Sequence, residues 1–295
     1  MLLRKDRFAR KVALLKRVGL FDANDRSVVV RRAIVRDDLI RAYRLVHDVF
    51  VDKGYIDPGP NGIRIRLFEA LPEMATFVAE ADGQMVGVMS IVPDSPDMGL
   101  PADKCFKTEL DRLRDAGRKV AEVTNLAVLS AYRRSNAFME LAKPVLAQAL
   151  SAGCDDVFIA ISPGHARFFQ DVLQFEPWGE RRSYSDEKMD IVEGKRWNLR
   201  TLERRLLDCD RLLGDDACLH EHFFPGNAYH QYVRPWALMA KRAFLDPDVL
   251  RALFVKRCHL LERCSPEQRL AISRRWGSTI FADVYHGETA ELTLA

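Results

Sequence analysis

The sequence predicts an α/β protein with a mixed, twisted sheet covered by helices on both faces and a helical extension at the C-terminus. Two observations favour this α+β arrangement. Strand-like and helix-like segments alternate between residues 27 and 180, and helical periodicity dominates from about residue 197 to the end. With 295 residues, of which 48% are hydrophobic and 29% charged, the chain can bury a full core, which excludes intrinsic disorder and a small disulfide scaffold.

The alternating region begins with a strand and a helix. Residues 27–33 are rich in β-branched side chains, which predicts a strand. Asp37 or Asp38 can cap the next helix, whose apolar positions recur at steps of three and four as far as Phe50. Residues 54–62 hold three glycines and two prolines and therefore predict a loop.

A hairpin and a second helix follow. The segments 75–80 and 84–92 flank Asp82-Gly83, and this dipeptide supplies the positive φ that a tight turn between twisted strands requires. The next helix carries Phe106 and Leu110 on one face and stops at Gly117.

The pattern then continues as strand, helix, strand, helix and strand. We expect these elements at residues 118–128, 136–152, 156–161 and 165–173, and from Phe175 onward. Such alternation implies strands of mixed direction with helices on both faces of the sheet.

The remainder of the chain has a different character. Residues 181–196 are polar and predict a hairpin around Glu193-Gly194. Apolar residues step by three and four along Leu199, Leu202, Leu206, Cys209 and Leu213. Asp246-Pro247 opens another helix, and the stretch 265–268 is a capping-box start.

These patterns divide the chain into three parts. They are a basic amphipathic arm (1–26), an α/β domain (27–180) and a mainly helical extension packed on it (181–295). The first 36 residues hold eleven Lys and Arg against three Asp, although the whole chain carries only +3. Because apolar residues from Phe8 to Val18 share one helical stripe, the arm suits packing on the body, an acidic protein partner or peripheral contact with a membrane, and we expect no nucleic acid.

The six cysteines contain no C-x-x-C pair, and charges interrupt the first twenty residues. We therefore expect reduced thiols, a cytoplasmic location and no secretory signal or membrane span. Cys218, His220 and His222 are of metal-ligand type, but their spacing matches no recognised site, so no metal is predicted.

One carboxylate in the strand 118–128 points to chemistry. In an extended strand Val120, Glu122, Thr124 and Leu126 face one side, and Ala121, Val123, Asn125 and Ala127 face the other. If both faces are covered, Glu122 is desolvated and its pKa rises above the ordinary value of about 4.3, toward that of a useful base. The alternative is a carboxylate on an exposed stretch of sheet or in a salt bridge.

Four segments carry a family resemblance: YRLVHDVFVDKGYI (43–56), FVAEADGQMVGVMSIVPDS (77–95), GLPADKCFKTELDRLRDAGRKVAEVTNLAV (99–128) and HARFF (165–169). They resemble the GNAT acyltransferase superfamily and, within it, the long-chain N-acyl amino acid synthases, relatives of the acyl-homoserine-lactone autoinducer synthases. The autoinducer synthases have an Arg in place of Val46 and a Trp in place of Tyr55. The resemblance therefore implies a GNAT-like fold and amide formation rather than lactone formation.

The chain departs from the superfamily members that use acetyl-CoA. Their Q/R-x-x-G-x-G/A loop binds a pyrophosphate at a helix N-terminus, where glycines allow close approach. Here Arg133 takes the Q/R place, but Asn136 and Phe138 occupy the glycine places. Phe168-Phe169 stands where a Tyr usually protonates the leaving thiolate. These differences count against an ordinary acetyl-CoA enzyme.

The resemblance implies an N-acyltransferase that moves a long acyl group from the phosphopantetheine of an acyl carrier protein to the amine of a free amino acid, with no tightly bound cofactor. Glu122 would accept the amine proton, and a strand bulge near Asn125 and Leu126 would free a backbone N–H for the thioester oxygen. The pantetheine and its phosphate would lie against the strand end and the next helix start, at Ala127, Val128, Arg133, Arg134, Ser135 and Asn136. Substrate contacts would come from Thr124, Tyr55, His165 and Phe169.

Several of these residues also fit purely structural roles. The two arginines can be ordinary solvated side chains, Thr124 can simply suit a strand, and His165 can be structural. The tail aromatics either bury the extension against the sheet or line a slot for an acyl chain: Phe223, Phe224, Tyr229, Tyr232 and Trp236. Two other functions compete, an acetyl-CoA-dependent N-acetyltransferase with a degenerate loop and a non-catalytic binding module that uses the basic arm.

Overall fold

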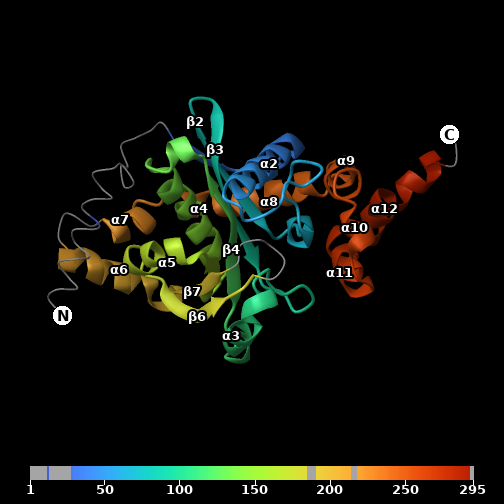
Figure 1. The fold of residues 1–295 in the computed structure, drawn as a ribbon. Helices are drawn as coiled ribbons and strands as arrows, with labels where there is room; N and C mark the ends of the chain where they lie inside the picture. The colour runs from blue at the N-terminus through green and yellow to red at the C-terminus, as the bar shows by residue number, and fades with distance from the viewer. Residues whose placement is uncertain (1–11, 13–27, 185–190, 214–217, 293–295) are drawn as a thin grey trace.

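A computed structural model describes residues 12, 28–184, 191–213 and 218–292 (Figure 1). Its seven-stranded sheet has the order β1-β2-β3-β4-β5-β7-β6. The strands are β1 (Val29–Arg32), β2 (Ala75–Ala81), β3 (Gln84–Pro93), β4 (Val120–Val128), β5 (Asp156–Ile161), β6 (Glu176–Arg182) and β7 (Val192–Asn198). Only β4 and β5 pair in parallel, and all other neighbours are antiparallel, which confirms the predicted mixed sheet.

Helices cover both faces of the sheet, as predicted. Those between strands are α2 (Arg36–Asp52), α3 (Asp103–Asp115), α4 (Ala137–Ser151) and α5 (Pro163–Asp171), with short 3-10 turns η1 (Leu67–Ala70) and η2 (Ser130–Tyr132). The extension adds α6 (Leu199–Leu213), α7 (Leu219–Phe223), η4 (Ala228–Gln231), α8 (Val233–Phe244), α9 (Pro247–Leu250), the π-helical η5 (Arg251–Val255), α10 (Leu260–Arg263), α11 (Pro266–Trp276) and α12 (Ser278–Leu292). No helix in these described ranges is long and apolar enough to cross a bilayer.

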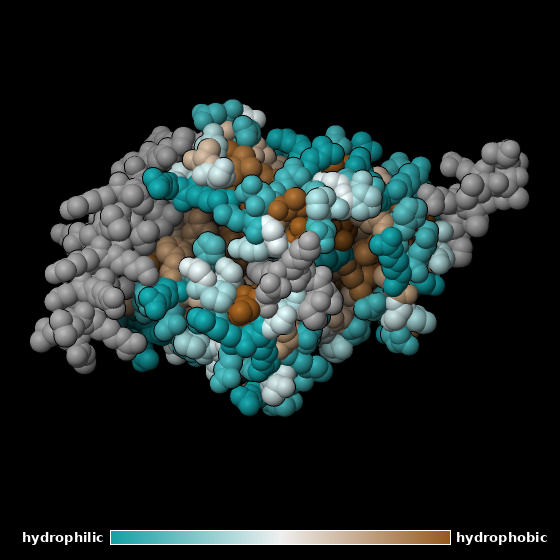
Figure 2. Space-filling view, viewed as in Figure 1, coloured by the Kyte–Doolittle hydropathy of each residue, from teal (hydrophilic) through white to brown (hydrophobic). Residues whose placement is uncertain are grey.

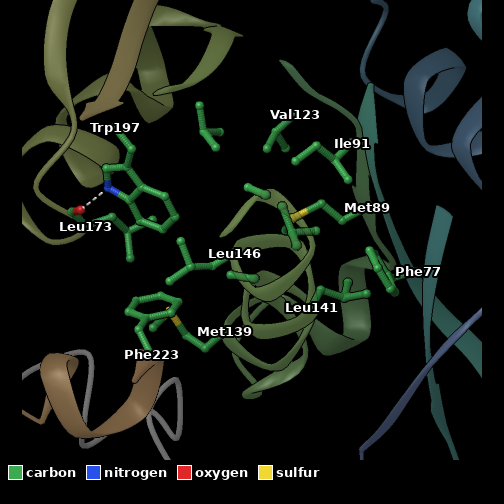
Figure 3. Packing of buried hydrophobic residues seen from close by; sticks show 14 of the residues in the cluster. Phe77, Met89, Ile91, Val123, Met139, Leu141, Leu146, Leu173, Trp197 and Phe223 are labelled. Atoms are coloured by element: carbon green, nitrogen blue, oxygen red, sulfur yellow. Dashed lines mark hydrogen bonds between the residues drawn. The ribbon is translucent and has the colours of Figure 1, made fainter. Parts of the chain in front are cut away.

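The larger apolar core lies between the sheet and α4. Figure 3 shows Phe77, Met89 and Val123 of the sheet facing Leu141 and Leu146 of α4. Burying such side chains contributes about 1.5–3 kcal/mol each, so this face provides much of the stability of the fold. Val12 is buried in the same core, whereas the rest of the predicted basic arm lies outside the described residues.

The other face is covered by α2, α3 and the end of the extension. Val46 of α2 belongs to the same apolar cluster as Phe254 and Trp276. The indole N–H of Trp276 also donates to the carbonyl of Ala70, at 2.9 Å. The last helices of the chain, at the right of Figure 1, are thus tied to the sheet domain through α2 and η1.

Two local predictions are wrong. The helix α2 begins at Arg36 and its N-cap is Val35, so Asp37 and Asp38 lie in the first turn instead of at the cap. Gly194 lies inside β7. A Cβ at this position would come within 2.9 Å of the Phe158 ring. The glycine therefore indicates close packing rather than a turn, and β7, beyond the expected boundary at residue 180, is an inner strand of the sheet.

Candidate active site

The site lies where β4 and β5 separate. The two strands pair at three positions only, the last being Glu122 opposite Phe158, although β4 continues to Val128 and β5 to Ile161. A cavity of about 430 Å³ lies at this fork and is lined by β4, β5, α2, α5 and the loop after α2. Figure 2 shows this side of the molecule, with hydrophobic residues in a hollow between hydrophilic ones.

Glu122 lies at the inner end of the cavity. Its side chain is 3% exposed, as the sequence predicts, and one carboxylate oxygen accepts a hydrogen bond from the backbone N–H of Ala102 at 2.7 Å. Burial raises the pKa of Glu122 to about 8, because one backbone donor and the positive charge of Arg66 offset only part of the desolvation. A carboxylate with this pKa can both accept and return a proton near neutral pH.

A β-bulge interrupts β4 just beyond Glu122. Val88 lies opposite Ala127 and Ser90 opposite Thr124, so β4 holds one extra residue, and Asn125 has a φ of 52°. An asparagine tolerates this left-handed conformation better than most residues. The bulge falls where the family resemblance implies one, it interrupts the ladder of β3 and β4, and its residues line the cavity.

The bulge also corrects one prediction. Regular alternation assigns Leu126 to the face of Glu122 and Asn125 to the opposite face. In the structure Leu126 packs in the α4 core with Val123, while Asn125 is bonded to Glu69 on the other side. The extra residue shifts the side-chain alternation by one position, and no residue type in the strand marks it.

A second buried carboxylate, which the sequence analysis missed, lies beside Asn125. Glu69 of η1 is 1% exposed and accepts hydrogen bonds from Arg66 at 2.8 Å and from the Asn125 amide at 2.9 Å. Burial alone would raise the pKa of Glu69, but the charge and hydrogen bond of Arg66, together with the charge of Arg64 and the Asn125 hydrogen bond, outweigh it and lower that pKa. Glu69 therefore stays ionised and fixes the polar wall of the cavity.

Two arginines of the loop after α2 complete that wall. Arg64 donates to the Asn125 side-chain oxygen at 2.8 Å, and its guanidinium lies 4.9 Å from the centre of the Phe50 ring. Arg66 donates to the hydroxyl of Thr124 at 3.0 Å. The spacing of Arg64 and Arg66 in the sequence predicts no binding site. The two arginines line the cavity because their loop packs against the β4 bulge.

An aromatic wall closes the opposite side of the cavity. Phe138 of α4 lies 5.5 Å from Phe168 and 5.8 Å from Phe169 of α5, measured between ring centres, and all three rings line the cavity. These are the glycine and tyrosine places of the acetyl-CoA motif. The side chains that replace the glycine and the tyrosine of that motif therefore contact one another and form one apolar surface.

Two cationic side chains lie at another part of the cavity wall. Lys53 and Arg133 line it together with His165, Tyr55, Ala127 and Val128. Burial, followed by the charges of Lys53 and Arg133, lowers the pKa of His165. An anionic group would be attracted to this part of the wall.

Three residues predicted to hold the carrier phosphate do not line the cavity. Arg134 is exposed, and Asn136 is buried at the start of α4. The Ser135 hydroxyl accepts from the backbone N–H of Ala137 at 3.2 Å and donates to the Tyr132 carbonyl at 2.8 Å, so it supports the start of α4. Arg133 alone of the RRSN run contributes to the cavity wall.

The tail aromatics serve packing. Phe223 lies against Trp197 and Met139 in the α4 core (Figure 3). The ring centre of Trp236 lies 6.3 Å from that of Phe77. None of the five tail aromatics lines the cavity at the fork. His222 is buried, with its ring nitrogen 3.2 Å from the Met139 carbonyl, and among the described residues no cluster of three potential metal ligands occurs.

Comparisons with known proteins agree with this architecture. Residues 41–192 match the family model of the N-acyl amino acid synthase FeeM. The solved structure of FeeM from uncultured soil microbes has a TM-score of 0.54 and 24% identity, covering 62% of this chain and 95% of that chain. The CoA-dependent acyl-homoserine lactone synthase BjaI gives a TM-score of 0.43 and 17% identity over 63% of this chain and 89% of its own. No curated protein sequence matches the chain.

Proposed function

Because the chain belongs to the family of the N-acyl amino acid synthase FeeM, and is therefore an acyltransferase with a GNAT-like fold, we propose that it transfers a long acyl group from an acyl carrier protein to the amine of a free amino acid. The observation that carries the proposal is Glu122, a buried carboxylate with a raised pKa at the fork of β4 and β5. The remaining walls of the cavity suit the three parts of such a reaction.

The first part is activation of the amine. An amino acid arrives as an ammonium ion, and the ionised Glu122 side chain takes one proton from it, directly or through one water. The freed nitrogen attacks the thioester carbon, and the carbonyl oxygen gains negative charge. A backbone N–H released by the bulge at Asn125 would stabilise that oxygen, a contribution of roughly 3 kcal/mol for one such donor.

The second part is departure of the thiolate. The carbon–sulfur bond breaks, the nitrogen gives its second proton to water as the amide forms, and the protonated Glu122 returns its proton to the sulfur. Acyl thioester and the ammonium form of the amino acid thus become N-acyl amino acid, free carrier thiol and one proton released to solvent, with no redox change. A group whose pKa is about 8 is suited to both proton transfers, because its ionised form is basic enough to take the ammonium proton and its protonated form is acidic enough to give that proton to a thiolate.

The third part is recognition of the two substrates. The wall of Arg64 and Arg66 suits the carboxylate of an amino acid, since guanidinium groups bind carboxylates through paired N–H donors. The wall of Phe138, Phe168 and Phe169 suits a hydrocarbon chain, with about 0.8 kcal/mol gained for each buried methylene.

The donor would approach along the cationic side of the cavity. Arg133 and Lys53 suit the single phosphodiester of phosphopantetheine. The side chain of Phe138 occupies a place where acetyl-CoA enzymes keep a glycine, and it favours a carrier-bound donor over the pyrophosphate of coenzyme A. This arrangement also fits a basic docking surface for an acidic carrier protein.

A direct assay tests the proposal. The purified protein is incubated with a mixture of the twenty amino acids and dodecanoyl carrier protein, dodecanoyl-CoA or acetyl-CoA, and the products are identified by mass spectrometry. We expect an N-dodecanoyl amino acid from the carrier-bound donor. Turnover with acetyl-CoA alone would favour an N-acetyltransferase, and no amide from any thioester would favour the binding module.

A further inference from the structure

A second cavity lies on the α4 side of the sheet, next to α8. Its volume is about 370 Å³, and it shares no lining residue with the cavity at Glu122. The sheet contributes Ile91 and Ala121, α4 contributes Ala149, and α8 contributes Leu238. Small and aliphatic side chains therefore form most of a slot whose size falls within the range of about 300–1,000 Å³ typical of small-molecule sites.

An arginine without a charged partner points to the ligand. Arg32 of β1 lines this cavity and is 5% exposed. One terminal nitrogen donates to the Met74 carbonyl at 3.0 Å, but the other, Nη1, has no hydrogen-bond partner within the described part of the chain. Burial lowers the pKa of Arg32 to about 10, which still leaves the guanidinium charged at neutral pH. A buried charge of this kind is costly unless an anion pairs with it.

The other polar groups at the cavity support the same conclusion. The Gln148 side chain lines it, and its amide oxygen also has no hydrogen-bond partner among the described residues. Glu73 lies at the half-exposed edge and pairs with Arg275 at 3.3 Å, while Lys241 is exposed on α8. Glu73 at the rim is thus paired with Arg275, whereas the buried Arg32 has no charged partner within the described part of the chain.

We propose that this cavity binds a long-chain carboxylate, with the carboxylate group on Arg32 and the hydrocarbon chain against Ile91, Ala149 and Leu238. A free fatty acid and an N-acyl amino acid both offer this chemistry. The carboxylate would accept from the unpaired Nη1–H of Arg32 and from the Gln148 amide, which can turn to present its N–H₂ group. The site is independent of the reaction proposed for the first cavity.

Binding of decanoate to the full-length protein tests this site. Arg32→Met keeps an apolar stem of similar size but removes the charge, and we expect the affinity for decanoate to fall about 10- to 100-fold. Arg31→Met is the matched control, because the neighbouring Arg31 pairs with Asp38 and Glu80 and does not line the cavity. The uncharged 1-decanol should bind equally to the wild type and to Arg32→Met.

Cys154 gives a local readout that separates the two cavities. It lines the second cavity and is half-buried, and Cys258 serves as a reference because it lines neither. Decanoate should slow alkylation of Cys154 but not of Cys258 in wild-type protein, as measured by peptide mass spectrometry, even if Arg32→Met does not fold. N-Decanoylglycine in a parallel arm shows which long-chain carboxylate binds more tightly. Unchanged Cys154 alkylation would overturn the proposal, as would equal decanoate affinity of the wild type and Arg32→Met.

Discussion

Two buried glutamates have opposite pKa shifts: Glu122, which lines the cavity at the fork, and Glu69, which bonds two residues of its wall. Glu122 of β4 and Glu69 of η1 are 3% and 1% exposed, so their desolvation is similar. Glu122 has one backbone donor and its pKa is raised, whereas Glu69 bonds Arg66 and Asn125 and its pKa is lowered. Burial therefore makes the charged form of a carboxylate unfavourable, and hydrogen-bond donors and positive charges nearby determine whether that form is stabilised in the folded protein. The difference supports the proposed role of Glu122 in proton transfer and suits Glu69 to structural support.

The largest expected effect is the loss of amide formation in Glu122→Gln. Glutamine has the same shape and can still accept from the Ala102 N–H, but it cannot take the amine proton. We expect the kcat for N-acyl amino acid formation to fall about 10²- to 10⁴-fold. The control is Glu80→Gln, which removes a carboxylate that pairs with Arg31 and does not line the cavity. Retention of more than about a tenth of wild-type activity would contradict the assignment of Glu122 as the base.

Glu69→Gln should mainly reduce stability. The substitution leaves the partly buried Arg66 without its carboxylate, and breaking a pair whose acid is fully buried should cost up to about 3–5 kcal/mol. Chemical denaturation at pH 7 measures the change in the free energy of unfolding. If Glu69→Gln unfolds at the same denaturant concentration as the wild type, the Arg66 pair does not hold this wall together.

Glu122→Gln should change stability in the opposite direction, and the change should depend on pH. The folded protein holds a proton on Glu122 up to about pH 8, whereas an unfolded chain releases it near pH 4.5, so wild-type stability falls as pH rises between these values. Glutamine removes this dependence. At pH 9 the variant should be more stable than the wild type by a few kcal/mol, and at pH 4 the two should be similar. Thermal unfolding of both proteins at both pH values measures this difference. Equal melting temperatures of the wild type and the variant at pH 9 would show that ionised Glu122 does not destabilise the folded protein.

A smaller effect is expected from Arg64→Gln. If the guanidinium binds the carboxylate of the amino acid, its removal should raise the KM for that substrate about tenfold or more, with kcat changed less. The KM for the acyl donor should stay within about twofold of the wild-type value, since the donor lies on the other wall. A fall in kcat without a change in KM would place Arg64 in support of the bulge instead.

The sequence predicts the elements of the sheet well and the site only in part. The hairpin at Asp82-Gly83, the strand 156–161 and the capping box at Ser265 depend on neighbours in sequence, and the structure confirms them. Glu122 could be predicted as a buried carboxylate because it is the only acidic residue in the mainly apolar strand 118–128. Arg64, Arg66 and Glu69 were missed because their roles arise from contacts with Asn125 some 60 positions away along the chain.

The smallest expected effect concerns the cationic side of the cavity and compares two adjacent arginines. Arg133 lines the cavity, while Arg134 is exposed and does not. Arg133→Gln should lower kcat/KM for the carrier-bound donor by about two- to fivefold at low salt, and the difference from wild type should shrink at 0.5 M salt because exposed charges are screened. Arg134→Gln should change kcat/KM less at either salt concentration. If both substitutions have the same effect, the pair acts as a general docking surface for the acidic carrier, and neither arginine is specific for the pantetheine phosphate.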